Sequence, residues 1–435
     1  MTTAPPLARL LDQTADAVAA VRAGRSLTET LTRVRQDLRP GTQALANEVL
    51  RGLGGAQAVR ALLASKTPPP NVDALLLCAL ALLWPRADTP PYPDHTLVDQ
   101  AVSAARSRTP AAAGFVNAVL RRFVRERDQL VKQARHQPQA AFNHPLWWIE
   151  RVRQDWPADW QALLLAANQP PPMVLRVNAR RCSALSYVQR LAALGMQAQV
   201  VGPQAVHLIR PCPVAELPGF AEGEVSVQDL SAQRAAPCLI GAGLEPRARV
   251  LDACAAPGGK TAHLLEMADL DVLALDADPL RLARVQDTLN RLQLQARLCC
   301  GDAREVSRWW DGKSFDAVLL DAPCTASGIV RRHPDVRWLR RPDDLVALAK
   351  LQSEMLDALW PLVAPGGRLL YVTCSIFRIE GQQQIDAFLQ RHAGDRPLWD
   401  PSSPGHLLPL PDNPEQQVAR QVVGDGFFYA LIRKP

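Results

Sequence analysis

Residues 249–276 read RVLDACAAPGGKTAHLLEMADLDVLALD. The stretch opens with an apolar run from Arg249 to Cys254, which is typical of a buried parallel strand. A tight turn and a helical segment follow, and a second apolar run ends at Asp276. This order of strand, turn, helix and strand predicts a βαβ unit. Such a unit binds a nucleotide-like ligand at the carboxyl ends of its strands.

The turn between the two strands has the composition of a ligand-binding loop. Gly258 and Gly259 lack a Cβ atom, so a ligand can approach the backbone closely. Asp276 follows Gly258 by 18 residues, about the distance at which a carboxylate takes ribose hydroxyls. The turn matches neither the G-x-G-x-x-G fingerprint nor a Walker loop, which weighs against a dinucleotide site and a Walker-type phosphate site.

Length and composition bound the class of protein. A chain of 435 residues predicts two or three domains, and 48% hydrophobic residues support substantial cores. No apolar run is long enough for a membrane span, and the N-terminus lacks a signal pattern, so we expect a cytoplasmic protein without membrane contact. The nine cysteines are irregularly spaced, which predicts neither a metal site nor a disulfide framework.

The basic residues are almost all arginine. The formal net charge is +6, and six of the 49 basic residues are lysine. Arginine makes planar contacts with phosphates and stacks on bases, so the charge is compatible with an RNA partner. A GC-rich coding sequence explains the same bias, and the composition alone favours that explanation.

The first half of the chain divides into two predicted domains. Residues 1–138 are expected to be helical, because apolar residues recur at three- and four-residue spacing, as in 72–83. The segment GFVNAVLRRF at 114–123 either docks RNA or a protein or is an ordinary solvated helix, and charge alone favours the second interpretation. Residues 139–220 combine strand-like and helical runs, which predicts a small α+β subdomain.

Residues 221–435 alternate between strand-like and helical runs, which predicts an open α/β sheet. A last strand, Phe427 to Ile432, is expected to end the sheet in an antiparallel position, and the Pro-rich stretch 395–415 is expected to be loop. Besides the two strands of the opening stretch, strands are expected at 296–300, 315–320 and 368–373.

Reactive or polar residues stand at the end of each predicted parallel strand. They are Cys254, Asp276, Asp302, Asp321 with Cys324, and Cys374. In an open parallel sheet all of them face one crevice. Asp276 suits ribose hydroxyls, and Asp302 can accept from an adenine amino group. Nothing in the sequence resembles a pyrophosphate clamp or a set of metal ligands, so S-adenosylmethionine fits better than NAD.

Cys324 and Cys374 stand at the ends of neighbouring strands. A thiol reacts as its thiolate, which a helix N-terminus or a nearby cation such as Lys260 favours. One thiolate can add to carbon 6 of a pyrimidine, which makes carbon 5 nucleophilic enough to take a methyl group from a sulfonium. A second thiol suits removal of the carbon-5 proton. The run 328–341, rich in arginine, follows Cys324, and we expect it to contact RNA.

Several motifs resemble those of the RNA 5-methylcytosine methyltransferases of the Sun/Nol1/Nop2 family. They are DACAAPGGKT, LDAPCTASGIVRRHPDVRW, VTCS, VQDLSAQ and GDGFFYA. The segment GFVNAVLRRF resembles the NusB-like domain that is joined to the methyltransferase in the bacterial ribosomal branch. The resemblance implies a NusB-like RNA-binding domain at 1–138, an RRM-like subdomain at 139–220 and a Rossmann-like class I methyltransferase domain at 221–435.

The resemblance also implies an activity and a set of residues. The expected reaction is methylation of carbon 5 of cytosine 967 of 16S rRNA, in Escherichia coli numbering, by a monomer that uses S-adenosylmethionine. The family nucleophile falls on Cys374 and the releasing cysteine on Cys324. Asp321 is also expected to touch the cytosine. The cofactor site falls on Cys254, Ala255, Ala256, Pro257, Gly258, Gly259, Lys260, Asp276, Asp302 and Asp321.

One motif departs from the family pattern, and alternative functions remain. The family has a Pro-Glu-Glu-Asn-like run after Cys-Ser, whereas this chain has Arg378-Ile379-Glu380-Gly381. Only Glu380 is kept, and we expect the region to order the following helix. A tRNA methyltransferase of the same family and a non-catalytic RNA-binding factor are the alternatives, although intact Cys324 and Cys374 speak against the second. An NAD-dependent oxidoreductase lacks its fingerprint.

Overall fold

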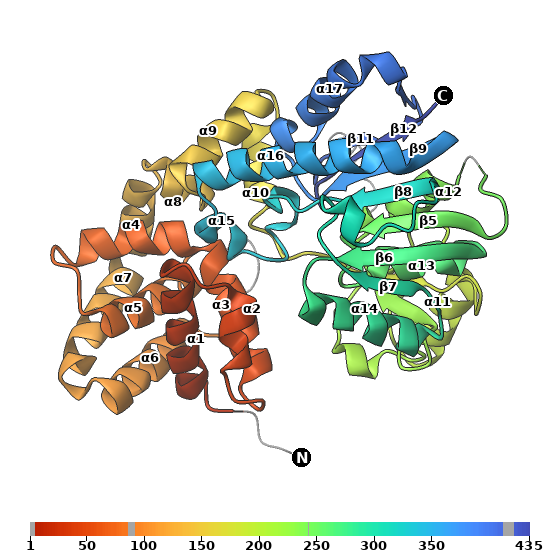
Figure 1. Ribbon diagram of the computed structural model, residues 1–435. Helices are drawn as coiled ribbons and strands as arrows, with labels where there is room; N and C mark the ends of the chain where they lie inside the picture. The colour runs from red at the N-terminus through yellow and green to blue at the C-terminus, as the bar shows by residue number, and fades with distance from the viewer. Residues whose placement is uncertain (1–4, 86–91, 242, 412–421) are drawn as a thin grey trace. The chain divides into compact units, whose positions relative to one another are not determined.

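The computed structural model describes residues 5–85, 92–241, 243–411 and 422–435 (Figure 1). The chain forms two compact units. The first comprises the chain up to Pro170 together with Val330–Pro342. The second comprises Pro171–Ile329 and Asp343–Pro435. No helix within the described residues is long and apolar enough to cross a bilayer.

The first unit is helical, which confirms the prediction for the N-terminal part of the chain. Its central helix, α5 (Pro70–Leu82), is apolar on all sides, and nearly every residue of α5 is buried by its neighbours. The helices extend past residue 138, because short helices continue the unit to Pro170. The others are α1 (Leu7–Arg22), α2 (Leu27–Thr32), α3 (Arg39–Arg51), α4 (Leu53–Leu63), α6 (Asp94–Arg108), α7 (Ala113–Ala134), α8 (Pro138–Phe142), α9 (Leu146–Asp155), α10 (Trp160–Ala166) and α15 (Val336–Leu339).

The inserted segment Val330–Pro342 caps helices of this unit. Arg337 is completely buried, and its guanidinium donates to the carbonyl oxygens of Asn143 (3.2 Å) and Ala167 (2.6 Å), which end α8 and α10. Asp335 accepts from the first amide of α2, Leu27, at 2.9 Å. Cations suit helix C-termini and acids suit N-termini, so these side chains satisfy backbone groups that a helix end leaves without partners.

The expected RNA contact is therefore wrong for part of the arginine-rich run. Arg337 has no exposed surface, and Arg331 is also buried. Burial lowers the pKa of Arg337, and the charge of Arg51 adds to that effect. The five donors of a guanidinium can serve several carbonyl groups at once, which explains why arginine stands at a buried junction of helix ends.

The second unit contains a four-stranded antiparallel sheet with the order β2-β3-β1-β4. Its strands are β1 (Met173–Val177), β2 (Ala198–Val200), β3 (Ala205–Leu208) and β4 (Val225–Val227), and it is accompanied by α11 (Ala184–Ala193). The expected α+β character is confirmed. β4, which the sequence analysis assigned to the start of the last domain, instead pairs with β1, with Leu175 opposite Val227.

The large sheet has the order β10-β12-β9-β8-β5-β6-β7, and β11 pairs with β12. The pairs among β5 to β9 are parallel, and β12 joins β9 antiparallel, as predicted. β10 and β11 lie in the stretch predicted as loop, because strands of two and three residues are too short for a periodic pattern. The strands are β5 (Ala248–Ala253), β6 (Leu270–Asp276), β7 (Arg297–Cys300), β8 (Phe315–Asp321), β9 (Val363–Thr373), β10 (Leu398–Trp399), β11 (Gly405–Leu407) and β12 (Phe427–Arg433).

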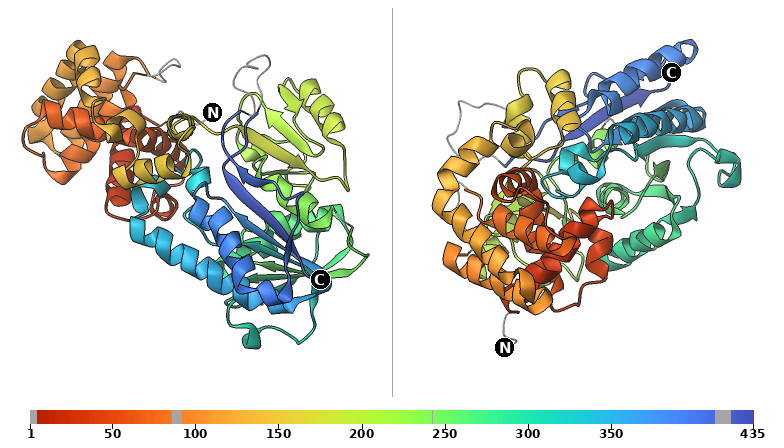
Figure 2. Two further views of the ribbon diagram at one scale, coloured as in Figure 1. Left: turned by 90° about the horizontal axis from the view of Figure 1, so that it is seen from above. Right: turned by 90° about the vertical axis from the view of Figure 1, so that its left-hand side faces the viewer.

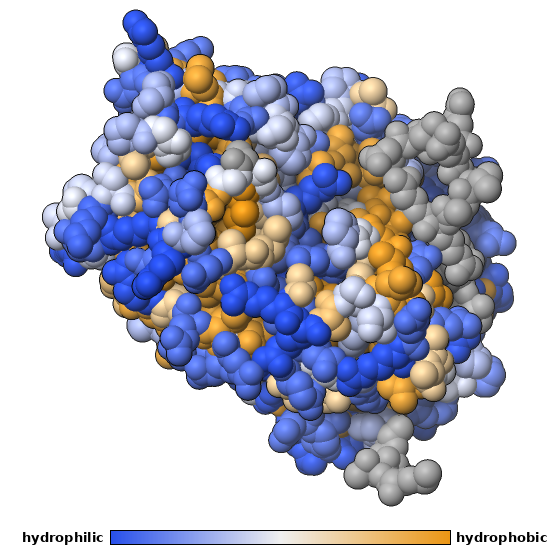
Figure 3. All heavy atoms as spheres, turned by 90° about the vertical axis from the view of Figure 1, so that its right-hand side faces the viewer, coloured by the Kyte–Doolittle hydropathy of each residue, from blue (hydrophilic) through white to orange (hydrophobic). Residues whose placement is uncertain are grey.

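Helices cover both faces of the large sheet, as the views in Figures 1 and 2 show. One core contains apolar residues of α12 (Ala235–Ile240), α13 (Gly259–Met267) and α14 (Pro279–Leu292). The other contains residues of α16 (Pro342–Leu359) and α17 (Gln382–Arg391). The face drawn in Figure 3 mixes hydrophilic and hydrophobic residues. The register aligns the carboxyl ends of the parallel strands, which leaves their loops at one edge of the sheet.

We expect Arg337→Met to lower the free energy of unfolding by about 3 kcal/mol, because hydrogen bonds to a charged group are worth about 1.5–3 kcal/mol and the buried carbonyls would lose their partner. Urea denaturation of the full chain, followed by circular dichroism, measures the change. Arg25→Met, at an exposed position of the same unit, is the control. Equal stability of the two variants would contradict a capping role for Arg337.

Candidate active site

The loop after β5 is shaped by its backbone. Cys254 and Gly258 both have positive φ angles, 86° and 93°. A Cβ atom on Gly258 would lie 3.1 Å from the Cα atom of Val285 in α14, so a side chain would also be crowded against the backbone of α14. Gly258 therefore allows the loop backbone to pack closely against α14. At Gly259, by contrast, a Cβ would meet only Gln228, at 3.7 Å.

Asp276 fixes this loop to the end of β6. The side chain is buried, and one carboxylate oxygen accepts from the backbone N–H of Ala256 at 3.1 Å. The other accepts from the N–H of Asp278 at 3.1 Å, and Arg281 lies 3.6 Å away. A carboxylate has about four lone-pair sites, so Asp276 keeps acceptor capacity beside the loop.

Asp302 follows β7 and is held by a residue that the sequence analysis did not single out. Arg304 binds its carboxylate, with 2.7 Å between Nη2 and Oδ2, and also bonds to Glu354. The hydrogen bond from Arg304 is the main cause that lowers the pKa of Asp302. Asp302 is therefore an ionised acceptor with a fixed orientation.

Asp321, at the end of β8, pairs with Lys260 at the start of α13, with 2.6 Å between Oδ2 and Nζ. Burial alone would lower the pKa of Lys260, but the charge of Asp321, its hydrogen bond and the nearby Cys374 raise it. Lys260 therefore stays protonated. It also lies 5.6 Å from the ring centroid of Phe427, within the range of a cation–π contact.

Two buried groups lie close to this ion pair. Burial raises the pKa of Asp252 to about 7, although a 2.6 Å hydrogen bond from Thr261 acts in the opposite direction. Burial is also the main cause that raises the pKa of Cys254, and the charges of Asp321 and Asp276 add to it. Cys254 is therefore a neutral thiol. Sequence reasoning missed Asp252, which the pattern presents only as one polar residue inside an apolar strand.

The structure brings Cys324 and Cys374 together, with 3.4 Å between their sulfur atoms. Neither sulfur is part of a disulfide bond in the described structure. The hydrogen bond with Cys374 is the main cause that raises the pKa of Cys324 well above its usual value, followed by burial and by the charges of Cys374 and Glu380. The arrangement is a pair of thiols that share a hydrogen bond beside a lysine cation. It suits nucleophilic addition by one thiol and proton transfer by the other.

The polar groups at the strand ends fit S-adenosylmethionine. Asp276 and Asp302 offer carboxylate acceptors, which suit hydroxyl and amino donors. The loop from Cys254 to Lys260 is bonded to Asp276 and to Asp321. A ligand without phosphates needs no cluster of basic side chains. Within the described parts of the chain, no group of three or more His, Cys, Asp or Glu residues could hold a metal ion.

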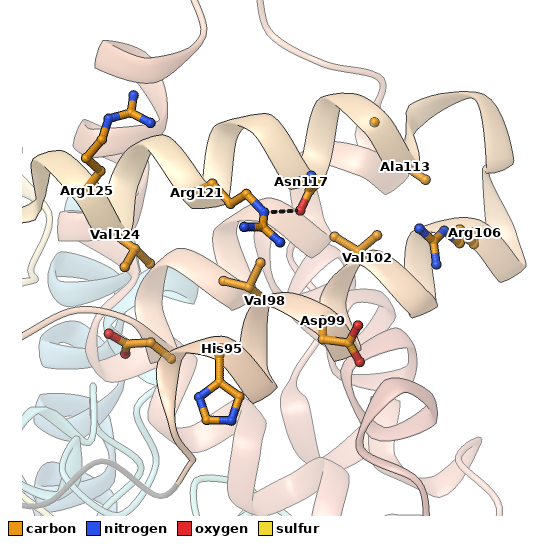
Figure 4. Close-up of a pocket in the computed structure, with 12 residues that line it drawn as sticks. His95, Val98, Asp99, Val102, Arg106, Ala113, Asn117, Arg121, Val124 and Arg125 are labelled. Atoms are coloured by element: carbon orange, nitrogen blue, oxygen red, sulfur yellow. Dashed lines mark hydrogen bonds between the residues drawn. The ribbon is translucent and has the colours of Figure 1, made fainter.

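The helical unit carries a separate hollow of about 750 Å³ between α6 and α7 (Figure 4). Gly114, Asn117 and Arg121 of the segment at 114–123 face it. Within the same segment Val116, Val119, Leu120 and Phe123 are buried in the helical core, whereas Phe115 is exposed. Arg121 donates to Asn117 at 2.9 Å, and Arg106 lines the same hollow from α6. Neither arginine forms an ion pair with a described residue.

Comparisons with known proteins match three parts of the chain to three family descriptions. The description "16S rRNA methyltransferase RsmB/F" matches residues 242–433. A "Methyltr_RsmF/B-like, ferredoxin-like domain" matches 144–215, and the NusB family matches 10–125. A protein of Pseudomonas syringae pv. tomato named "Ribosomal RNA small subunit methyltransferase B" is 42% identical, with 97% of this chain and 96% of that protein covered.

The chain belongs to the RsmB/F methyltransferase family. A protein of the same name from Xylella fastidiosa is 48% identical, with 83% of this chain and 84% of that protein covered. The solved structure named PH0851 is 25% identical and has a TM-score of 0.73, with 98% of this chain and 99% of that chain covered. As a member of this family, the chain takes its methyl group from S-adenosylmethionine.

We expect Asp276→Ala to weaken S-adenosylmethionine binding by about tenfold or more, because hydrogen bonds to a charged acceptor are worth about 1.5–3 kcal/mol. Calorimetric titration of the full chain measures the affinity. Asp271→Ala is the control, because Asp271 stands near the start of the same strand and pairs with Arg297 at the surface. Unchanged affinity in Asp276→Ala would remove Asp276 from the cofactor site.

Proposed function

We propose that this chain methylates carbon 5 of a cytosine in 16S rRNA, with cytosine 967 as the expected target, through a covalent adduct on Cys374. The names of the RsmB/F relatives support a ribosomal RNA substrate. The observation that carries the chemistry is the thiol pair Cys324–Cys374, 3.4 Å apart, beside the ion pair Lys260–Asp321. In this proposal the chain acts as a monomer.

Cys374 is the nucleophile in this scheme. The protonated Lys260 favours its thiolate, which adds to carbon 6 of the cytosine ring. The electrons of the carbon 5–carbon 6 double bond move to carbon 5, which becomes nucleophilic. Bound S-adenosylmethionine supplies an electrophilic methyl group at this carbon. Asp321 accepts a hydrogen bond from the exocyclic amino group, which distinguishes cytosine from uracil.

Cys324 completes the reaction. Once Cys374 is bonded to the ring, Cys324 releases its own proton to solvent. The resulting thiolate takes the proton from carbon 5, and the electrons of that bond restore the ring double bond while Cys374 leaves as a thiolate. A high pKa makes a thiolate a strong base, and the pKa of Cys324 is raised by its bond to Cys374, by burial and by the charge of Glu380.

We expect Cys374→Ala to abolish methyl transfer while S-adenosylmethionine binding stays near the wild-type value, because only the nucleophile is lost. Cys324→Ala should instead trap a covalent protein–RNA adduct, which appears as a shifted band on a denaturing gel. Cys182→Ala, outside the large sheet, is the matched control. Turnover by Cys374→Ala would refute the assignment.

The target nucleotide is tested in cells. Bisulfite sequencing of 16S rRNA from a strain without the gene should show one lost 5-methylcytosine, at position 967. Loss of a methylcytosine from a tRNA instead would favour the tRNA methyltransferase of the same family. A full set of methylated cytosines in both RNAs would favour a non-catalytic RNA-binding factor.

The hollow between α6 and α7 is part of the proposed RNA surface of the helical, NusB-like domain. Arg106 and Arg121 line it, and each has a guanidinium without a carboxylate partner in the described chain. Arginine binds phosphates through two parallel hydrogen bonds, so two such side chains in one concave surface suit an RNA backbone.

We expect the double variant Arg106→Glu/Arg121→Glu to bind rRNA more weakly and to reduce the salt slope of log K by about 1.5, because each phosphate contact contributes roughly 0.7–0.9. Filter binding at a series of salt concentrations measures both quantities. Arg25→Glu/Lys66→Glu, at two exposed sites of the same unit, changes the net charge by the same amount and is the control. An identical slope in the double variant and the control would exclude this hollow from RNA binding.

A further inference from the structure

A buried carboxylate lies next to both cysteine loops. Glu380 ends a short 3₁₀ turn before α17 and has no exposed surface. It accepts from the backbone N–H of Thr325 at 2.8 Å and from the hydroxyl of Ser375 at 2.6 Å. Thr325 directly follows Cys324, and Ser375 directly follows Cys374. One carboxylate therefore bonds to the residue next to each thiol.

Two more donors complete the surroundings of Glu380. The hydroxyl of Thr325 donates to the second oxygen, and the side-chain amide of Gln352 donates at 3.1 Å. The same amide donates to the carbonyl of Pro323 at 2.9 Å, so Cys324 is held through both of its neighbours. Burial raises the pKa of Glu380, while the bonds from Ser375 and Thr325 oppose that rise. Four donors and no acceptor suit the ionised form.

Further hydrogen bonds join the two cysteine loops directly. Some of them depend on which partner receives the hydroxyl proton of Ser375. The hydroxyl of Ser375 gives its one proton to Glu380, so its lone pairs accept from Ser327 at 2.8 Å and from the N–H of Phe377 at 3.0 Å. The N–H of Gly328 donates to the carbonyl of Cys374 at 3.0 Å. The carboxylate thus orients a network that crosses between the two loops.

We propose that Glu380 is a positioning residue, whose buried carboxylate sets the separation of the Cys324 and Cys374 thiols by holding Thr325 and Ser375 at once. The inference rests on the proposed function, in which both thiols react in turn with one pyrimidine. Glu380 contacts no reacting atom. Its effect on the rate comes from geometry, because a displacement of about 1 Å can cost about 100-fold in rate.

The first test is kinetic and uses the full-length protein with S-adenosylmethionine and rRNA. Glu380→Gln keeps the shape of the side chain but places an NH₂ group among four donors, so the loops have to move apart. We expect kcat to fall about 100-fold, with the KM and the binding affinity for S-adenosylmethionine unchanged. Gln384→Ala is the control, because Gln384 is buried on α17 and bonds across to Ala349 of α16 without contacting a cysteine loop.

The second test reports the thiol geometry without RNA or cofactor. Diamide takes two electrons and two protons from a pair of close thiols and leaves a disulfide. The Cys324–Cys374 disulfide, followed by peptide mapping, should form at least tenfold more slowly in Glu380→Gln than in the wild type or Gln384→Ala. A change in overall stability alone would not produce this difference between the two variants.

The outcomes separate the two hypotheses. Wild-type kcat and wild-type disulfide formation in Glu380→Gln would overturn the role of Glu380. An equal loss of kcat in Gln384→Ala would also overturn it, because the loss would then reflect general destabilisation. Slower disulfide formation in Glu380→Gln, together with no covalent RNA adduct in Cys324→Ala, would support the positioning of the thiols and overturn the proposed function.

Discussion

The parallel pairing of β8 with β9 is the constraint on which the site depends. The register sets Asp321 opposite Val372, and Cys324 and Cys374 follow these residues by three and two positions. Neighbouring strands lie about 4.8 Å apart, so loops that leave two such strands at the same edge start within reach of each other. The backbone bond from Gly328 to Cys374 then continues the pairing beyond the strands. The register thus brings the two cysteine loops together, and their sulfur atoms lie 3.4 Å apart.

Different charged residues act on the two thiols. Lys260, fixed by Asp321, interacts electrostatically with Cys374, whereas Glu380 interacts with Cys324. A cation favours a thiolate and an anion opposes it. The charge of Glu380 adds to the bond with Cys374 and to burial, which together raise the pKa of Cys324. The strand register brings the two thiols to one edge of the sheet, and the charged residues that act on them differ.

The sequence predicts those elements of the fold that have a recognisable local pattern of residues. Buried parallel strands are apolar runs, and their ends carry polar residues, so β5, β6, β8 and the residues after them could be located. The pairing of β4 with β1 and the capping by Arg337 depend on partners far away in sequence. A run of exposed arginines and one that contains a buried capping arginine have the same composition. Short strands such as β11 have too few residues for a pattern.

The insertion of Val330–Pro342 adds a constraint on the order of folding. The helical unit takes its N-terminal part from the chain up to Pro170, but Asp335 and Arg337, which cap α2, α8 and α10, come after β8. Until that segment is made, the ends of these helices lack their partners, and a helix end without partners is costly when buried. The helical unit therefore reaches its final stability only after the chain has passed Cys324. The loop that carries Cys324 leads directly into this segment in the sequence, so the chain has to complete β8 and this loop before the helix ends of the first unit gain their partners.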